Sequence, residues 1–372
     1  MADVVIIGGG VIGLTAAYEL AGEGLAVEVL DQVQFGREAS WAGAGLLPPG
    51  NLSHAKTPGA KLRAASHKLW PRLTAELREA TGIDNGYVNC GGIEMRVGGP
   101  KGQLDDLAQS WRDEGVEIEE LDTDSALELE PNLNPETVSA FRLPEKCQVR
   151  NPRHVKALVA ACATRNVNLS AGTRVVGFTS SNGKYTGVRT TQETIQAGQI
   201  LVCAGAWTGK LMASVGFQVP VRPVRGQMVL MSTNALPVRH LLGYGSRYLV
   251  PRPDGRILVG STEEWVGFHK QNTAGGVAEL LRFAATLVPS LVNVGFEQCW
   301  SGLRPESADH LPYLGSVGGT ENLFVAAGHF RSGLQMSPAS ALLIRQTMLG
   351  QEPMIPIEPY AVGRSGSFSD GG

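Results

Sequence analysis

The stretch VVIIGGGVIGL, residues 4–14, places three consecutive glycines directly after four β-branched residues. Residues 4–7 predict a short parallel strand that is buried on both faces. The segment 11–24 has apolar residues at helical spacing and ends in two glycines, which favour a helix C-terminus. The next segment, AVEVLD at 26–31, predicts a second strand that ends on an acid. This order of elements predicts a βαβ unit at the start of the chain.

The glycine spacing of this unit matches the physical needs of a dinucleotide site. Gly8 permits a tight turn, Gly10 lets backbone N–H groups approach a pyrophosphate, and Gly13 lets the helix pack closely on the strand. The phosphates would then lie at the positive end of the helix dipole. Asp31 is placed to accept hydrogen bonds from the ribose hydroxyls. A purely structural glycine turn is the alternative, but the complete strand-helix-strand-acid context favours a dinucleotide site.

The composition is that of an ordinary globular chain, with 372 residues, 43% hydrophobic and 18% charged, and its length favours two domains. A formal net charge of -3 leaves no electrostatic footprint for nucleic acid or an acidic membrane. The five cysteines show no CxxC or metal-like spacing, so we expect free thiols and no metal. No basic residue precedes the N-terminal apolar run, and no segment is long enough to cross a membrane. We therefore expect a cytoplasmic protein.

The choice of dinucleotide depends on residues beyond the glycine turn. An acid at the end of the second strand disfavours NADP but suits both NAD and FAD. The segment GREASWAGAGLLPPG, 36–50, is rich in small residues and would let the chain pass close to a second part of a large ligand. This favours FAD, although a flexible Gly/Ala loop is an alternative.

Three C-terminal segments, together with GGGVIG and SWAGAGLL, carry a resemblance to a known family. They are YLVPRPDGRILVGST (248–262), CWSGLRPESADHLPYLG (299–315) and FVAAGHFRSGLQMSPA (324–339). Together they resemble the D-amino-acid oxidase and glycine oxidase family of FAD enzymes, and within it the bacterial ThiO type of thiamine synthesis. The resemblance extends to about residue 362. It implies a small amino-acid substrate, molecular oxygen as electron acceptor and a homo-oligomer.

The resemblance also implies an α/β fold with two domains. A discontinuous Rossmann-like FAD-binding domain is expected over 1–87, 145–215 and 302–363. A second, largely antiparallel-sheet substrate domain is expected over 88–144 and 216–301. Residues 364–372 are expected to form a disordered tail.

Local patterns add three expectations. Residues 61–82 predict one helix that is kinked or broken at Pro71. Residues 87–97 predict a hairpin, and the PDG sequence at 253–255 predicts another. Arg252 and Arg256 are expected to be surface charges of this second hairpin.

Amino-acid oxidation by a flavin requires the protein chiefly to hold the substrate carboxylate, keep its amine neutral and exclude water. An arginine suits the first task because its planar fork makes two parallel charged hydrogen bonds. Arg304 and Arg331 have apolar and glycine neighbours, unlike most solvated surface arginines. The resemblance matches Arg304 to the family's carboxylate-binding arginine, Arg331 to a second substrate-side arginine, and Tyr248 to a tyrosine that bonds the carboxylate. Two surface charges and a packed strand tyrosine are the alternatives.

The segment 329–343 predicts a turn into a helix whose positive end lies over Ser332 to Leu334, where the family places the flavin pyrimidine edge. His329 at this turn is expected to pack or cap rather than act as a general base, because no acid is dedicated to it. The cofactor-binding residues expected in addition to Gly8, Gly10, Gly13 and Asp31 are Val11, Ile12, Gln32, Ala39, Ser40, Ala44, Gly45, Leu46, Val175, Ala204, Gly205, His329, Arg331, Ser332, Gly333 and Leu334.

Two departures from related sequences bear on the chemistry. Covalent relatives attach the flavin to a cysteine near the segment that matches SGLRP, which has no cysteine here, and Cys299 is expected to belong to the preceding strand. We therefore expect non-covalent FAD. Glu263 follows LVGST, where related sequences commonly carry an apolar residue. It is either a charge at the rim of the site or a residue that favours a substrate other than glycine.

These observations predict an FAD-dependent oxidase of glycine, sarcosine or small D-amino acids that produces the imine or oxo acid and hydrogen peroxide. A related dehydrogenase that uses another electron acceptor is the second possibility, although no amphipathic membrane anchor is found. A flavin-binding subunit without chemistry of its own is the third. The predicted carboxylate grip argues against this last possibility.

Overall fold

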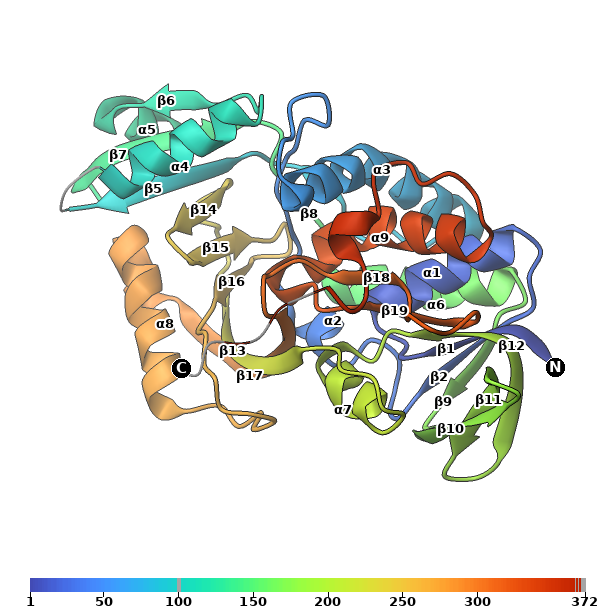
Figure 1. The fold of residues 1–372 in the computed structure, drawn as a ribbon. Helices are drawn as coiled ribbons and strands as arrows, with labels where there is room; N and C mark the ends of the chain where they lie inside the picture. The colour runs from blue at the N-terminus through green and yellow to red at the C-terminus, as the bar shows by residue number, and fades with distance from the viewer. Residues whose placement is uncertain (99–101, 365, 367, 369–372) are drawn as a thin grey trace.

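The computed structural model describes residues 1–98, 102–364, 366 and 368, and two eight-stranded sheets organise it (Figure 1). The strands of the first sheet are, in order, β10 (Val175–Ser181), β11 (Lys184–Thr190), β12 (Thr194–Val202), β1 (Ala2–Ile7), β2 (Val27–Asp31) and β9 (Asn168–Ala171). Two more strands join it through β12, namely β19 (Leu323–Ala327) and its antiparallel neighbour β18 (Tyr313–Ser316). The helix α1 (Val11–Gly22) connects β1 to β2, which lie parallel. The predicted βαβ unit is confirmed.

The strand β1 is buried on both faces because its apolar side chains alternate between two hydrophobic clusters. Val4 and Ile6 pack with the helices on one face, and Val5 and Ile7 pack on the other face with β10, β11 and α7 (Thr208–Ala213). The helices on the first face, seen together at the right of Figure 1, are α1, α3 (Pro58–Thr81), α6 (Asn151–Thr164) and α9 (Gly333–Met348).

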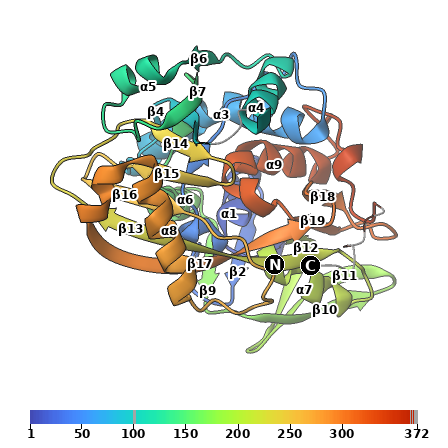
Figure 2. The ribbon, with the colours of Figure 1, turned by 90° about the vertical axis from the view of Figure 1, so that its left-hand side faces the viewer.

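The second sheet is antiparallel except where β14 pairs in parallel with β5. Its strands are, in order, β17 (Gly295–Ser307), β13 (Val221–Ser232), β16 (Arg256–Gly260), β15 (Arg247–Pro251), β14 (Leu241–Tyr244), β5 (Gly92–Val97), β7 (Thr137–Leu143) and β6 (Glu119–Leu121). The helix α8 (Ala274–Leu287) lies across this sheet (Figure 2), where Leu280 and Leu287 share a core with Val229 and Val259. The expected α/β fold with a largely antiparallel second sheet is confirmed.

Short elements complete the chain. They are α2 (Ala39–Ala42), α4 (Gly102–Asp113), α5 (Thr123–Leu129), the strands β3 (Leu46–Leu47), β8 (Cys147–Gln148) and β4 (Val88–Asn89) of a small third sheet, and the 3-10 helices η1 (Gly205–Trp207), η2 (Pro289–Asn293), η3 (Phe330–Ser332) and η4 (Glu358–Tyr360). Within the described residues, no helix is both long and apolar enough to span a bilayer.

The structure tests three local predictions. The hairpin over 87–97 is wrong, because β4 pairs with β8 while β5 pairs with β7 and β14. The single helix predicted over 61–82 is confirmed by α3, which continues through Pro71 without a break, and Trp70 and Leu73 on either side of the proline are buried. Arg364, the first residue of the expected tail, forms an ion pair with Asp309. Residues 365, 367 and 369–372 of that tail lie outside the described residues.

The division into two domains stays a prediction, and the two sheets can be compared with its boundaries. Residues of the first sheet come from segments within 1–87, 145–215 and 302–363, and the predicted boundary between residues 301 and 302 falls inside β17. That strand pairs with β13 as far as Ser307. The strand β17 therefore belongs to the second sheet but continues past the predicted boundary into the segment 302–363, which also supplies two strands of the first sheet.

Candidate functional site

A cavity of about 820 Å³ lies between the glycine turn of the first sheet and strand β17 of the second. Every residue predicted above to bind cofactor or substrate lines this cavity except Gly13. Among the described residues, no group of three His, Cys, Asp or Glu side chains could hold a metal ion.

The glycine turn is shaped by close backbone contacts. Gly8 has φ +111°, and a Cβ atom there would lie 2.3 Å from the carbonyl oxygen of Cys203. A Cβ atom at Gly13 would lie 2.0 Å from the carbonyl oxygen of Gly8. Gly13 therefore lets α1 pack closely on the turn, which is the role that its spacing predicts. Because it faces the turn, it does not line the cavity. Gly10 precedes the first turn of α1, so the positive end of this helix faces the cavity.

Asp31 connects the end of β2 to the glycine turn. Its carboxylate accepts hydrogen bonds from the backbone N–H groups of Gly9 (2.8 Å) and Val33 (3.0 Å). Burial raises the pKa of this carboxyl group, and the two hydrogen bonds oppose that rise. Each carboxylate oxygen has further lone pairs, so Asp31 can hold the turn and still accept from a ribose hydroxyl.

The segment 39–46 follows the cavity wall and is fixed by side chains from other parts of the chain. Asn151 donates to the carbonyl oxygen of Ser40 (2.9 Å), and the Ser40 hydroxyl accepts from the backbone N–H of Val11 (2.9 Å). Arg252 donates to the carbonyl oxygen of Ala44 (2.7 Å). The position of this wall therefore depends on residues that are distant in the sequence.

The expectation that Arg252 is a surface charge is wrong. Its side chain is buried and also donates to the Gln148 amide oxygen (2.7 Å) and the Val149 carbonyl oxygen (3.1 Å). Burial lowers the pKa of Arg252 to about 10, so the side chain remains charged at neutral pH. Oxygen acceptors from two separate segments make this burial tolerable. Arg256 lies at the surface as expected, in ion pairs with Asp254 and Glu297.

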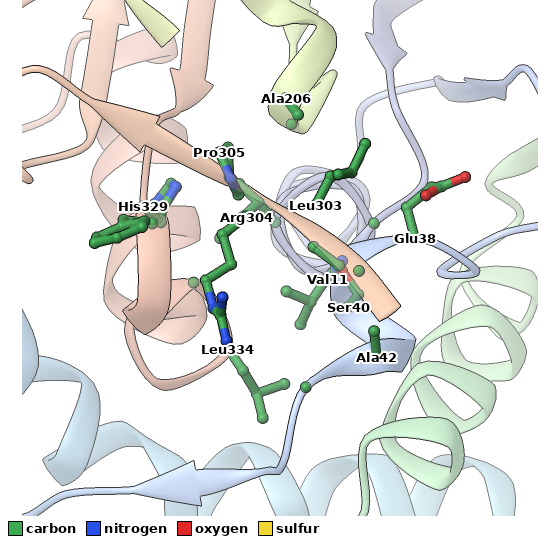
Figure 3. A pocket seen from close by; sticks show the side chains of 18 of the residues that line it. Val11, Glu38, Ser40, Ala42, Ala206, Leu303, Arg304, Pro305, His329 and Leu334 are labelled. Atoms are coloured by element: carbon green, nitrogen blue, oxygen red, sulfur yellow. The ribbon is translucent and has the colours of Figure 1, made fainter. Parts of the chain in front are cut away.

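Arg304 projects from β17 into the cavity (Figure 3). Its guanidinium donates to the Ser261 hydroxyl (2.6 Å) and to the Thr262 carbonyl oxygen (3.2 Å). Gly226 on the neighbouring strand makes room for it, since a Cβ atom there would lie 2.2 Å from Arg304 Nη1. The hydroxyl of Tyr248 lies 3.4 Å from the same Ser261 oxygen. The structure thus brings the two predicted carboxylate-binding residues together.

Arg331 enters the cavity from η3 and forms an ion pair with Glu263. His329, two residues earlier, is buried and shares a hydrogen bond of 2.9 Å with Ser340. Burial lowers the pKa of His329 to about 3, which keeps the ring neutral and agrees with a packing role. The N-terminus of α9 also opens onto the cavity through Gly333.

Several residues that line the cavity were not predicted from the sequence. Ser261 accepts a hydrogen bond from Arg304, and Gly226 leaves room for the Arg304 guanidinium. Both roles depend on contacts between distant segments, so no local pattern in the sequence pointed to them. Arg37, Arg174 and Lys210 add positive charge to the cavity from three separate segments. No spacing in the sequence connects these three.

The cavity fits an elongated dinucleotide. The glycine turn and the N-terminus of α1 provide a place for phosphates, and Asp31 provides an acceptor for a ribose. The second helix N-terminus, at α9, lies at the same cavity as Arg304. A flat, negatively polarised ring system is compatible with that end.

Comparison with known proteins agrees with this geometry. Residues 3–347 match the DAO family model, described as FAD dependent oxidoreductase. The chain is 37% identical over 363 residues to a glycine oxidase of Pseudomonas putida, covering 96% of this chain and 98% of that protein. It is 34% identical to a protein of Trichormus variabilis named bifunctional protein ThiO/ThiG, covering 94% of this chain and 53% of that one. The crystal structure of glycine oxidase from Geobacillus kaustophilus superposes with a TM-score of 0.93 at 34% identity, covering 98% of this chain and 99% of that one.

The family match covers nearly the whole chain, and the cavity has the features that a bound dinucleotide needs. The resemblance stated from the sequence and the expectation of FAD are therefore confirmed. The chain belongs to the FAD-dependent oxidoreductase family, and FAD is its cofactor.

Proposed function

We propose that this protein oxidises glycine or a similarly small amine-bearing carboxylate, such as sarcosine or a small D-amino acid. For glycine, the balanced reaction converts glycine, oxygen and water to glyoxylate, ammonia and hydrogen peroxide. When bound, FAD supplies the two-electron oxidation of the carbon–nitrogen bond. The glycine oxidase names of the relatives support this choice of substrate.

The observation that carries the proposal is the setting of Arg304. Its guanidinium lies in the cavity and, among the described residues, has no acidic partner within ion-pair distance. The hydrogen bonds it donates go to neutral oxygens. A substrate carboxylate could replace the Ser261 hydroxyl as the acceptor of Arg304 and Tyr248. Such an exchange suits a carboxylate because charge-assisted hydrogen bonds are stronger than those to a neutral hydroxyl.

Other groups of the chain are proposed to bind the cofactor. We propose that Gly8, Gly10, Asp31 and the wall at 39–46 hold the cofactor without a covalent bond. Cys299, the cysteine nearest in sequence to SGLRP, packs against the core of the second sheet. Cys203 lines the cavity beside Gly8, but burial raises the pKa of its thiol and disfavours the nucleophilic thiolate. As a biological role, we propose supply of the oxidised product to thiamine thiazole synthesis.

The purified yellow protein tests this function directly. We expect hydrogen peroxide formation with glycine, sarcosine, D-alanine or D-proline in a peroxidase-coupled assay, and loss of flavin absorbance when oxygen is excluded. If an amino acid bleaches the flavin but no peroxide forms in air, the result would favour a dehydrogenase that passes electrons to another acceptor. Flavin that no amino acid bleaches would overturn it.

A further inference from the structure

The substrate end of the cavity contains two arginines in different electrostatic states. Arg331 is paired with Glu263, whereas Arg304 has no acidic partner among the described residues. The Glu263 side chain is 20% exposed and that of Arg331 is 51% exposed. This end of the cavity therefore presents one compensated and one uncompensated guanidinium.

Glu263 belongs to the segment 261–263, whose first two residues orient Arg304. Ser261 and Thr262 accept the hydrogen bonds of Arg304, and Glu263 follows them directly. The next residue, Glu264, is directed elsewhere, since it pairs with Arg225 and Gln227 and does not line the cavity. Of these two consecutive acids, only Glu263 can act on a ligand in the cavity.

We propose that Glu263 restricts the enzyme to substrates with a single carboxylate. By neutralising Arg331, it leaves Arg304, among the described residues, as the cation available to a substrate anion at this end of the cavity. A second carboxylate would have to displace Glu263 from Arg331 and would then lie beside the displaced negative charge. Like charges placed side by side disfavour such a ligand. This inference rests on the proposed function, because it names the substrate class of the same site.

The test compares ligands that differ by one negative charge. Iminodiacetate and its monoamide have nearly the same shape, and the ratio of their kcat/KM values measures selection during turnover. Malonate and acetate lack an amine, and the ratio of their Kd values, measured by isothermal titration calorimetry on the holoenzyme, measures selection without turnover. Because Arg331 is half exposed and its charge is partly screened, we expect Glu263→Gln to shift each ratio about tenfold toward the dicarboxylate.

Three variants separate this role from a general effect of charge. Glu297→Gln removes the same charge from a surface pair with Arg256 outside the cavity and is expected to leave both ratios unchanged. In the double variant Glu263→Gln/Arg331→Gln, the shift of both ratios toward the dicarboxylate is expected to disappear, because no second cation remains. Arg331→Gln alone is expected to move both ratios further against dicarboxylates, because Glu263 is then uncompensated.

Unchanged ratios in Glu263→Gln, or a gain that persists in the double variant, would overturn the proposal. If Glu263→Gln does not fold, the ratios of Arg331→Gln decide, and unchanged ratios there would count against it. If the wild type oxidises no amino acid, the proposed function fails while the malonate and acetate affinities still decide the role of Glu263.

Discussion

Arg304 and Tyr248 donate hydrogen bonds to one atom, the hydroxyl oxygen of Ser261, at 2.6 and 3.4 Å. The two donors come from different strands, β17 and β15, yet they converge on the same point of the cavity. A carboxylate oxygen near this point could accept from both. We therefore propose that Ser261 orients Arg304 and Tyr248, the pair predicted to bind the substrate carboxylate, before substrate arrives.

Ser261→Ala tests this convergence. The substitution removes the shared acceptor but leaves Arg304 bonded to the carbonyl oxygen of Thr262. Because a substrate carboxylate takes the place of this hydroxyl, the expected loss comes from the less fixed orientation of Arg304 and Tyr248, and we expect kcat/KM for glycine to fall about tenfold. A simple amine without a carboxylate should be much less affected. Ser246→Ala, at an exposed turn of the same cavity, is the matched control, and equal losses in both variants would contradict the role of Ser261.

Arg304→Ala is expected to retain FAD and to lose most turnover with amino acids, because the substrate carboxylate is left without its charged partner. Arg304→Lys should restore activity only in part, since an ammonium group cannot reproduce the two-pronged geometry. Steady-state kinetics with glycine and with a simple amine measure the difference. Wild-type kcat/KM for the best amino acid in Arg304→Ala would show that Arg304 is structural.

Asp31→Ala is expected to weaken FAD retention about ten- to a hundredfold, because hydrogen bonds to a charged acceptor contribute about 1.5–3 kcal/mol. Asp31 also holds Gly9 and Val33, so Asp31→Asn, which keeps one acceptor oxygen, should lose less. Dialysis followed by flavin fluorescence gives the dissociation constants, and circular dichroism checks the fold. Unchanged affinity in a folded Asp31→Ala protein would make Asp31 a residue of the turn alone.

We predict that acid or detergent denaturation releases the flavin into the supernatant. The prediction follows from the packing of Cys299 against the second core and from the burial of the Cys203 thiol, which raises its pKa and disfavours the thiolate. Absorbance at the flavin maximum in supernatant and pellet measures the distribution. Yellow colour that stays with the precipitated chain would contradict non-covalent binding.

His154 predicts a pH dependence of folding stability. The ring is fully buried between Trp70 and Asn85, and burial lowers its pKa to about 3. In the unfolded chain a histidine titrates near pH 6.5, at roughly the value of a free side chain. Between these two values the unfolded state binds a proton that the folded state does not. The stability contributed by the neutral ring is therefore present above pH 6.5 and is lost as the pH falls.

This group should add about 1.4 kcal/mol per pH unit to the slope of unfolding free energy between pH 6 and 4. Urea unfolding of His154→Gln should show a slope smaller by that amount. The exposed His269 provides the control His269→Gln, which should keep the wild-type slope. Identical slopes for the wild type and His154→Gln would show that the buried ring takes up a proton.

The glycine turn at the start of the chain was predictable because its spacing is local. The positive φ of Gly8 and the contact of Gly13 with Gly8 lie within residues 8–13, whereas the carbonyl oxygen of Cys203 beside Gly8 and the residues that fix the wall at 39–46 come from distant segments. The apolar periodicity of residues 4–31 likewise specifies a buried strand, a helix and a second buried strand. Long-range pairing was less accessible, as the wrong hairpin at 87–97 illustrates. There, β4 and β5 each pair with strands from distant segments.

The end of the cavity that is predicted to bind substrate depends on the tertiary structure. Arg304 and Tyr248 could be named from their motifs, but their meeting at Ser261 depends on the arrangement of β15, β16 and β17 in one sheet. Burial of Arg252 depends on carbonyl oxygens from Ala44 and Val149, far away in the chain.

The pairing of Glu263 with Arg331 joins residues 68 positions apart. Local sequence determined where the backbone turns and which faces are apolar. The state of each charge followed from the partners that the fold brings within hydrogen-bond distance, because desolvation and pairing depend on surroundings that no short motif contains.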